Sequence, residues 1–444
     1  MIDTILCLLG LLIFSPWIIQ IFSTQWNSKI WHRQLLITAF AFELIAVLYI
    51  PVVMYIGVGL LFLCLIIYLI KERPKIHITP FFVFALLYFA WYAISLLWSP
   101  APKKGLQFII DNGFVLASMA FIPCFIQFKK EEYIPILKLL CYSSCIFIGL
   151  SLISWIIASF EIQLPIWEWP ILQKKHVEGV ASYTWIYRFL GGMKGYIHPS
   201  YNLLPIFIAT PIAIWLYKRN NLSPYVWIYL WAGACILTLI TQSRMGIIYS
   251  AIILISNLIY ISSSFKLKIS IVCVVCILSA FGLYYAQDFL HQYGNDQVRG
   301  QLHENTIRYI KVKPLKGAGA GALNPIEICK TIDEKYWPHI GEIDKTMEVK
   351  DWKPKAHMLP HNQWLADWAH AGIIAAIITL ALYICIGIQC YNTKNYWGGI
   401  ALLIFTIFSL LEPPLYISKG LYLFCLISCL IYMDLNQNYI TSPK

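Results

Sequence analysis

The sequence predicts an all-α polytopic membrane protein. The chain has 444 residues, of which 59% are hydrophobic and only 12% are charged. Soluble domains average about 25% charged residues, so this composition indicates that lipid surrounds much of the chain. The apolar residues also fall into continuous runs, and a membrane-spanning helix needs about 20 such residues. Continuous runs favour helices, whereas a spanning barrel would show alternation.

Thirteen apolar runs are candidate membrane spans. They are 2–22, 35–50, 52–70, 80–98, 110–128, 135–158, 200–217, 224–241, 245–263, 268–286, 371–391, 397–413 and 420–434. The division at Pro51 is the weakest, because the two short runs beside it can also form one long kinked segment. We therefore expect a bundle of about 12–13 helices. The first run lacks the basic start and cleavage site of a signal peptide, so we expect it to be retained.

Basic residues in the short loops predict the orientation. They alternate with less basic loops and comprise Lys71, Arg73, Lys75, Lys129, Lys130, Lys218, Arg219, Lys266 and Lys268. The positive-inside rule places these loops in the cytoplasm. The large polar insertion, roughly residues 288–360, then faces outward, as does the smaller loop at 161–198. The predicted organisation is an N-terminal transmembrane bundle (1–286), a large outer loop (287–362) and C-terminal transmembrane helices (363–444).

The net charge of +11 limits the classes of partner. Topology explains part of it, and the remainder suits anionic lipids or phosphorylated substrates. We expect membrane lipids as partners and no nucleic acid. The thirteen cysteines lie almost entirely within apolar runs, where small packing residues are the better interpretation.

The large outer loop is predicted to be partly helical. Residues 298–312 show apolar side chains at roughly helical spacing, and this helix should end at Pro314. The glycines of Gly317-Ala-Gly319-Ala-Gly321 follow. A dinucleotide fingerprint needs a preceding strand, a following helix and a distant acid, and none is visible here. We therefore expect a flexible turn acting as a loop hinge, although its amides can also line an anion site.

Two arginines near predicted membrane boundaries are candidate anion ligands. Arg244 lies between two apolar spans, where an ionisable group is costly unless it faces a polar cavity or a partner. The alternative is a headgroup anchor that reaches the interface. Arg299 opens the predicted loop helix and shares one face with His303. Guanidinium groups suit pyrophosphate oxygens better than lysine does.

His361 and Asn362 directly precede the apolar span that ends the large loop. A helix N-terminus favours neutral imidazole, the form that a general base requires. A boundary histidine without a catalytic role is the alternative. Asn362 is expected to cap the helix or to orient a sugar. His370 lies deeper in the span and is interpreted as structural.

Zinc and glycosidase chemistry are less favoured. His357 and His361 have zinc-like spacing, but Pro360 breaks the helix between them and no glutamate follows in the required place. Asp367 and Glu412 are acids in or beside apolar spans, and a two-carboxylate glycosidase would need such acids to converge on one face. The sequence does not establish that convergence.

In their order and spacing these features resemble the O-antigen ligase family, within the wider superfamily of polymerases and ligases of lipid-linked glycans. The similar motifs are Leu97-Trp98-Ser99-Pro100, Ser243-Arg244, Arg299 followed by Pro314-Leu315-x-Gly317-x-Gly319, and His361-Asn362 separated from Gly372 by nine residues. The family pattern then asks for Gly, Thr or Tyr where this chain has Ala375. The motif matches lie chiefly between residues 243 and 375.

The resemblance implies a fold similar to C-type glycosyltransferases and a role in lipopolysaccharide biosynthesis. The implied reaction transfers a glycan from undecaprenyl pyrophosphate to a sugar hydroxyl of lipid A–core, on the periplasmic side of the bacterial inner membrane, without metal or cofactor. His361 is the implied general base, and Arg244, Arg299 and Arg188 are the implied pyrophosphate ligands. The supporting residues in this interpretation are Asn362, Gly372 and Ser243.

Other functions are also considered. An O-antigen polymerase uses the same donor with a second lipid-linked chain as acceptor. A protein O-oligosaccharyltransferase also uses this donor, although many carry a further C-terminal region. From a different class, a transporter or flippase for lipid-linked sugars is disfavoured because the sequence shows no inverted repeat and few mid-membrane charges.

Overall fold

The computed structural model describes residues 9–10, 12–16, 30–49, 51–162, 199–241, 243–262, 264–266, 268–270, 303, 306–307, 309–311, 313–321 and 360–434. Within these ranges the chain forms helices and turns without a strand, which confirms the predicted all-α class. Six helices in these ranges are long and apolar enough to cross a membrane, and several shorter apolar helices accompany them. The predicted runs 2–22 and 268–286 lie mostly outside the described residues.

The first two fully described helices form an antiparallel hairpin. They are α2 (Trp31–Tyr49) and α3 (Pro51–Glu72). His32 at the start of α2 lies 2.5 Å from Glu72 at the end of α3, so the two helices run in opposite directions. Pro51 stands at the first position of α3, where its fixed φ and missing N–H are tolerated. The alternative of one long kinked segment at Pro51 is therefore wrong.

A second hairpin follows. It consists of α4 (Pro80–Ser95), η1 (Leu96–Trp98), α5 (Pro102–Phe108), the π-helical η2 (Ile109–Phe114), α6 (Val115–Phe121) and η3 (Ile122–Cys124). The hydroxyl of Thr79 accepts a hydrogen bond from the Phe82 amide and caps α4. The return limb thus spans Pro102–Cys124, somewhat earlier than the predicted run at 110–128.

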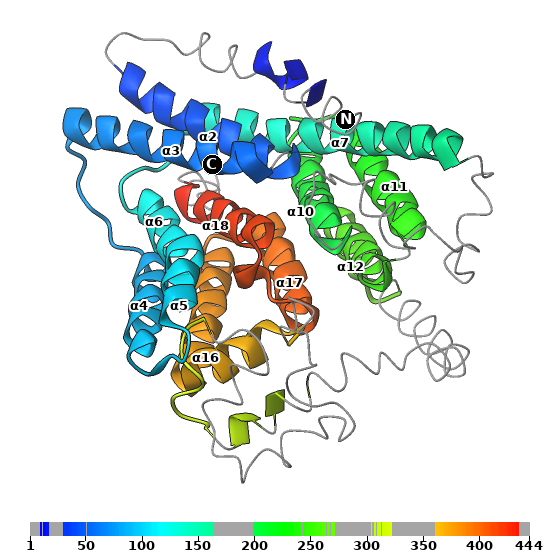
Figure 1. The fold of residues 1–444 in the computed structure, drawn as a ribbon. Coiled ribbons are helices and arrows are strands. Elements are labelled where there is room, and N and C mark those ends of the chain that lie inside the picture. Colours follow the sequence, from blue (N-terminus) through cyan, green and yellow to red (C-terminus); the bar gives the residue numbers. More distant parts are fainter. Residues whose placement is uncertain are drawn as a thin grey trace, which may run out of the picture.

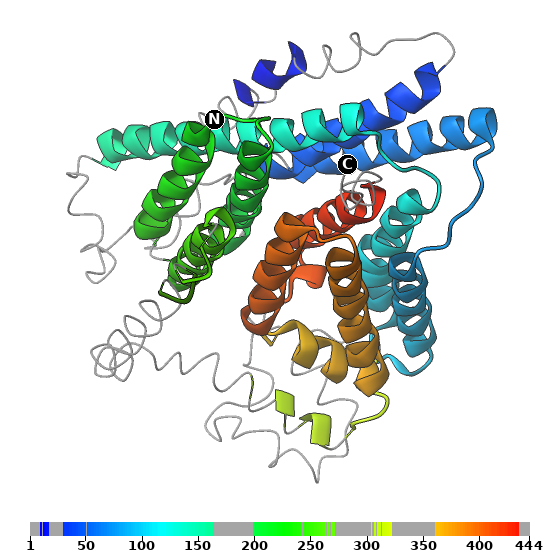
Figure 2. The same ribbon diagram turned by 180° about the vertical axis from the view of Figure 1, so that it is seen from behind.

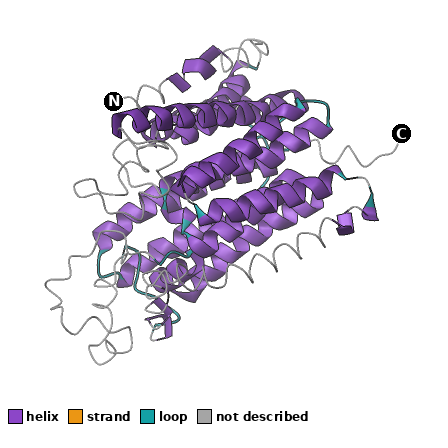
Figure 3. Cartoon of the chain, turned by 90° about the vertical axis from the view of Figure 1, so that its right-hand side faces the viewer, coloured by secondary structure: helices purple, strands orange, loops and turns teal. Residues whose placement is uncertain are grey.

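The remaining helices are α7 (Lys130–Ile162), α10 (Pro199–Lys218), α11 (Pro224–Thr241), α12 (Arg244–Ile261), α16 (Gln363–Asn392), α17 (Tyr396–Leu411), η6 (Pro414–Tyr416) and α18 (Ser418–Met433). In Figure 1, α2, α3 and α7 lie across the top of the view, above α10–α12 on one side and α4–α6 with α16–α18 on the other. Figure 2 shows the same arrangement from behind, and Figure 3 shows its helical character from the side.

The core of the described bundle lies around α18. Every residue from 419 to 433 is buried, and this helix packs against α2, α6, α16 and α17. An apolar helix with no exposed face is typical of the centre of a bundle rather than of its lipid-facing rim.

The two ends of α4 separate the segments that the sequence assigns to opposite sides of the membrane. Beside its start, the His77 amide donates to the Cys124 carbonyl, and the Phe128 amide donates to the Met433 carbonyl (both 2.8 Å). At its other end, the Ser95 hydroxyl accepts from the Ala320 amide. The predicted basic loops at 71–75 and 129–130 therefore share one end, and the described part of the large loop lies at the other.

Candidate active site

His361 and Glu412 form the contact on which the candidate site is built. The Nδ1 atom of His361 lies 3.1 Å from Oε2 of Glu412. The side chain of Glu412 is 6% exposed and that of His361 is 29% exposed, so the carboxylate is buried while the imidazole remains partly open. A buried carboxylate beside a partly open imidazole is the arrangement of a histidine oriented by its partner.

A bend in α16 brings these two residues together. α16 and α17 pack as an antiparallel pair joined by a short turn at 393–395. The 30 residues of α16 would span about 45 Å if straight, whereas the 16 residues of α17 span about 24 Å. A straight α16 would therefore carry His361 well past Glu412. Non-helical backbone angles at Ala371 and Gly372 turn the first segment, residues 363–370, back toward the end of α17 (Figure 2).

The carboxylate of Glu412 favours one tautomer of His361. A carboxylate accepts hydrogen bonds, so its contact with Nδ1 favours the form in which Nδ1 carries the proton. The other ring nitrogen, Nε2, is then left with its lone pair. Such a histidine can accept a proton at Nε2, and the carboxylate then stabilises the imidazolium that forms.

Asn362 fixes the start of α16. Its Oδ1 accepts from the Leu365 amide at 3.0 Å, which makes it the N-cap of the helix. Its Nδ2 donates to the carbonyl of Leu410 at 3.0 Å. One side chain therefore both caps α16 and ties it to the end of α17. The cap was one of the two roles predicted from the sequence.

Gly372 makes the bend possible. Its backbone has φ 80° and ψ −178°, a region that is essentially restricted to glycine. The bend lies against the turn at 313–321, which contacts the carbonyls of Ala369 and His370. Those carbonyls accept from the amides of Ala318 (2.8 Å) and Gly319 (2.6 Å), which lie in the turn after Pro314.

The turn at 313–321 is packed against the bend rather than free. The Ile373 amide and the Trp368 indole both donate to the carbonyl of Pro314, at 3.1 and 2.8 Å. All three glycines of the turn have positive φ: Gly317, Gly319 and Gly321, with φ of 62°, 97° and 87°. The expectation of a flexible hinge is therefore wrong. The glycines are needed for a close backbone contact that the sequence pattern alone does not display.

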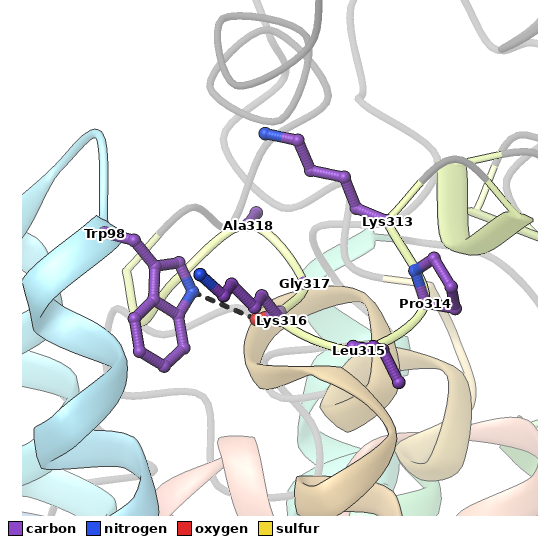
Figure 4. Close-up of a pocket in the computed structure, with 7 residues that line it drawn as sticks. All are labelled: Trp98, Lys313, Pro314, Leu315, Lys316, Gly317 and Ala318. Carbon is purple, nitrogen blue, oxygen red and sulfur yellow. Dashed lines mark hydrogen bonds between the residues drawn. The ribbon is translucent and has the colours of Figure 1, made fainter.

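The motif at the end of α4 joins the same contact. The indole of Trp98 donates to the Lys316 carbonyl at 3.0 Å (Figure 4), and the Ser99 hydroxyl donates to the Ala320 carbonyl at 2.5 Å. The indole of Trp91 donates to Ala371 within the bend at 2.7 Å. A cavity of about 360 Å³ lies beside this contact, lined by Trp98, Lys313, Pro314, Leu315, Lys316, Gly317 and Ala318.

Three motifs that are distant in the sequence thus meet at one end of the bundle. They are the Leu97–Pro100 segment, the turn at 313–321 and the stretch from His361 to Gly372. Backbone hydrogen bonds join the turn at 313–321 to the bend in α16. A movement of the first segment of α16 away from the turn would break these hydrogen bonds. The contact therefore fixes the element that carries His361.

The arginine predictions fall largely outside the described residues. Ser243 caps α12, because its hydroxyl accepts from the Gly246 amide at 3.2 Å. Arg244 is the first residue of α12, but its side chain is outside the described part of the structure. Arg188 and Arg299 also lie outside it. Their role as pyrophosphate ligands stays a prediction.

Two further histidines, His370 and His303, lie near the candidate site. His370 is buried, and its Nδ1 lies 2.7 Å from the Tyr416 hydroxyl, so it is the structural histidine that was predicted. His303, predicted to share a helix face with Arg299, places Nε2 3.4 Å from the backbone carbonyl of His361. Residue 303 of the large outer loop therefore lies beside the candidate site.

Fold and site together define a multi-pass helical membrane protein with a polar site at one end of its bundle. Residues 228–380 match the family model described as O-antigen ligase. This match covers less than half of the chain and bears out the resemblance to the O-antigen ligase family that the sequence motifs predict. The match indicates a protein of the glycosyltransferase-like ligase or polymerase type. A search of curated proteins found no match.

The matched region contains His361, Gly372 and the glycine turn but ends before Glu412. The partner of His361 was missed by sequence reasoning, which noted Glu412 only as an acid in or beside an apolar span. The available signal was its position: a lone acid at the end of an apolar run, directly before Pro413-Pro414. Such an acid needs a partner, and the partner could be identified only from the fold.

Proposed function

We propose that this protein is an O-antigen ligase, which transfers a glycan from undecaprenyl pyrophosphate to a sugar hydroxyl of lipid A–core. The observation that carries the proposal is the hydrogen bond between His361 and Glu412 at the predicted outer end of the bundle. The match to the O-antigen ligase family model supports a lipid-linked glycan as substrate, and this pair supplies a base for activating a hydroxyl. The site then faces the periplasm, in a protein of the bacterial inner membrane.

In the proposed reaction the acceptor hydroxyl attacks the anomeric carbon of the donor sugar. The proton of that hydroxyl moves to Nε2 of His361, the new glycosidic bond forms, and the bond from the anomeric carbon to the pyrophosphate oxygen breaks. The electron pair leaves with undecaprenyl pyrophosphate, and attack from the opposite face inverts the configuration. General base catalysis of this kind typically contributes about 10²–10⁴-fold.

Glu412 acts through His361 in this scheme. It orients the ring and stabilises the imidazolium while the proton resides on Nε2. Because the leaving group is a pyrophosphate, no strong general acid is needed on the donor side. The reaction requires groups that hold the departing anion, and Arg244, Arg299 and Arg188 are the proposed ligands. The position of Arg244 at the start of α12 supports its part, because a helix N-terminus favours an anion.

Deletion of the gene tests the proposal and separates it from its alternatives. Loss of a ligase leaves lipopolysaccharide without long glycan, while long lipid-linked glycan accumulates. Loss of a polymerase leaves caps of a single repeat, and loss of a flippase traps single repeats on the cytoplasmic leaflet. Complementation with the wild-type gene should restore long caps, and His361→Ala should not. A deletion strain with single-repeat caps or unchanged lipopolysaccharide would contradict ligase activity.

A further inference from the structure

Asp367 is the centre of a buried hydrogen-bond network beside the candidate site. The residue is fully buried, and its two carboxylate oxygens have five side-chain partners from α4, α16 and η6. These are Tyr92 (2.6 Å), Tyr416 (3.1 Å) and Tyr88 (3.3 Å) on Oδ1, and Thr379 (2.7 Å) and Gln363 (2.9 Å) on Oδ2. A buried carboxylate is costly unless such donors satisfy it, so the network defines one arrangement of its partners.

The network joins the two segments that carry His361 and Glu412. Gln363, two residues after His361, donates to Asp367 through Nε2 and accepts from the Leu415 amide through Oε1 at 2.9 Å. Tyr416 donates to Asp367 and also contacts Nδ1 of His370. The first segment of α16 is thereby attached at both its ends to Leu415 and Tyr416, in the short segment after Glu412.

We propose that Asp367 is a positioning residue that sets the contact between His361 and Glu412. This inference rests on the proposed function, in which His361 is the general base. Asp367 lies too deep to touch a substrate, so its effect passes through the two segments that it joins. If the network is broken, His361 and Glu412 lose their common anchor although both side chains remain. A displacement of about 1 Å at such a pair can lower a rate on the order of 10²-fold.

Asp367→Asn in the full-length protein tests this role. Asparagine keeps the size of the side chain but replaces one carboxylate oxygen with an amide donor, so the donors around position 367 can no longer all be accepted. We expect a kcat about 10²-fold lower, with unchanged KM values for donor and acceptor. The matched control is Tyr383→Phe, which removes an equally buried bond between α16 and α17, from Tyr383 to Ser409 at 2.6 Å. That control should keep the wild-type kcat.

A double-mutant cycle separates positioning from general loss of structure. If Asp367 acts through His361, then Asp367→Asn added to His361→Ala should lower the residual rate no further, because coupled residues are non-additive. A role confined to stability would lower the rate by the same factor in both backgrounds. That additive result, or an Asp367→Asn enzyme with the kcat of the Tyr383→Phe control, would overturn the inference.

A second measurement does not depend on the substrate. His361 can be carbethoxylated with diethyl pyrocarbonate at fixed pH, and the extent of reaction at that peptide followed by mass spectrometry. We expect Asp367→Asn to change the rate of His361 carbethoxylation in the same direction as Glu412→Gln does. The Tyr383→Phe control should keep the wild-type rate of carbethoxylation. If the wild-type protein transfers no glycan but this pattern holds, the proposed function fails and the positioning role stands. If Asp367→Asn reacts like wild type, the positioning role fails.

Discussion

Gly372 and Leu315 pack backbone against backbone at the bend of α16. A β-carbon built on Gly372 would lie 1.9 Å from the carbonyl oxygen of Leu315, far inside van der Waals contact. The turn at 313–321 and the bend therefore fit together only when residue 372 is glycine. Because this contact directs the first segment of α16 toward α17, the glycine at position 372 determines where His361 lies.

Gly372→Ala should destabilise the protein and lower its activity. Alanine must adopt a backbone region that is essentially restricted to glycine, at a cost of about 1–3 kcal/mol, and it also displaces Leu315. Thermal unfolding of the purified protein in detergent measures the effect. Gly399→Ala is the control, because a β-carbon there meets nothing within 4 Å. Equal melting temperatures for the two variants would contradict the packing described for Gly372.

Trp98→Phe should weaken the attachment of the turn while preserving an aromatic ring. The change removes the donor to the Lys316 carbonyl, which is worth about 0.5–1.5 kcal/mol net. Trp227→Phe is the matched control, since the Trp227 indole nitrogen has no hydrogen-bond partner within the described residues. We expect a lower melting temperature for Trp98→Phe than for Trp227→Phe. The reverse order would contradict a stabilising role for the Trp98 bond.

Glu412→Gln should lower kcat but leave more activity than His361→Ala. Glutamine can still contact Nδ1, but it cannot stabilise the imidazolium with a charge. Because general base catalysis as a whole typically contributes about 10²–10⁴-fold, loss of the charge on its partner should cost no more than that. Rates of glycan transfer by purified enzyme measure this, with Glu131→Gln at the opposite end of the bundle as control. An unchanged kcat for Glu412→Gln would remove Glu412 from the mechanism.

Arg244→Ala should raise the KM for the lipid-linked donor, and Arg244→Lys should restore it only in part. A lysine supplies the charge but not the planar fork that matches pyrophosphate oxygens. Arg219→Ala is the control, because the Arg219 guanidinium lies 3.7 Å from the centre of the Trp215 ring, at the end predicted to be cytoplasmic. A donor KM that is the same for Arg244→Ala and Arg219→Ala would exclude Arg244 as a donor ligand.

The helical elements could be predicted because hydrophobic runs mark them directly. The run at 224–241 coincides with α11 at both ends, and α12 begins one residue before its predicted start. Sequence spacing also predicted that His361 stands at a helix start and that Asn362 caps the helix. These features depend on neighbours in the chain, which a sequence displays.

The contacts that build the site could not be predicted in the same way. Gly372 lies at the start of an apolar run, where a glycine is compatible with an ordinary helix, so the bend was not visible. Glu412 and Asp367 gain their partners only when α16, α17 and η6 are placed in space. The glycine turn was interpreted as flexible because its backbone partners, Ala369 and His370, lie far along the chain.

Glycan transfer by the purified protein with and without His361 tests the central claim most directly. Wild-type protein in lipid nanodiscs is supplied with undecaprenyl-pyrophosphate-linked glycan and lipid A–core, and the product is resolved by electrophoresis. We predict transfer by the wild type and only a residual rate, about 10²–10⁴-fold lower, by a His361→Ala variant of equal melting temperature. Transfer by that variant at the wild-type rate would contradict the assignment of His361 as the general base.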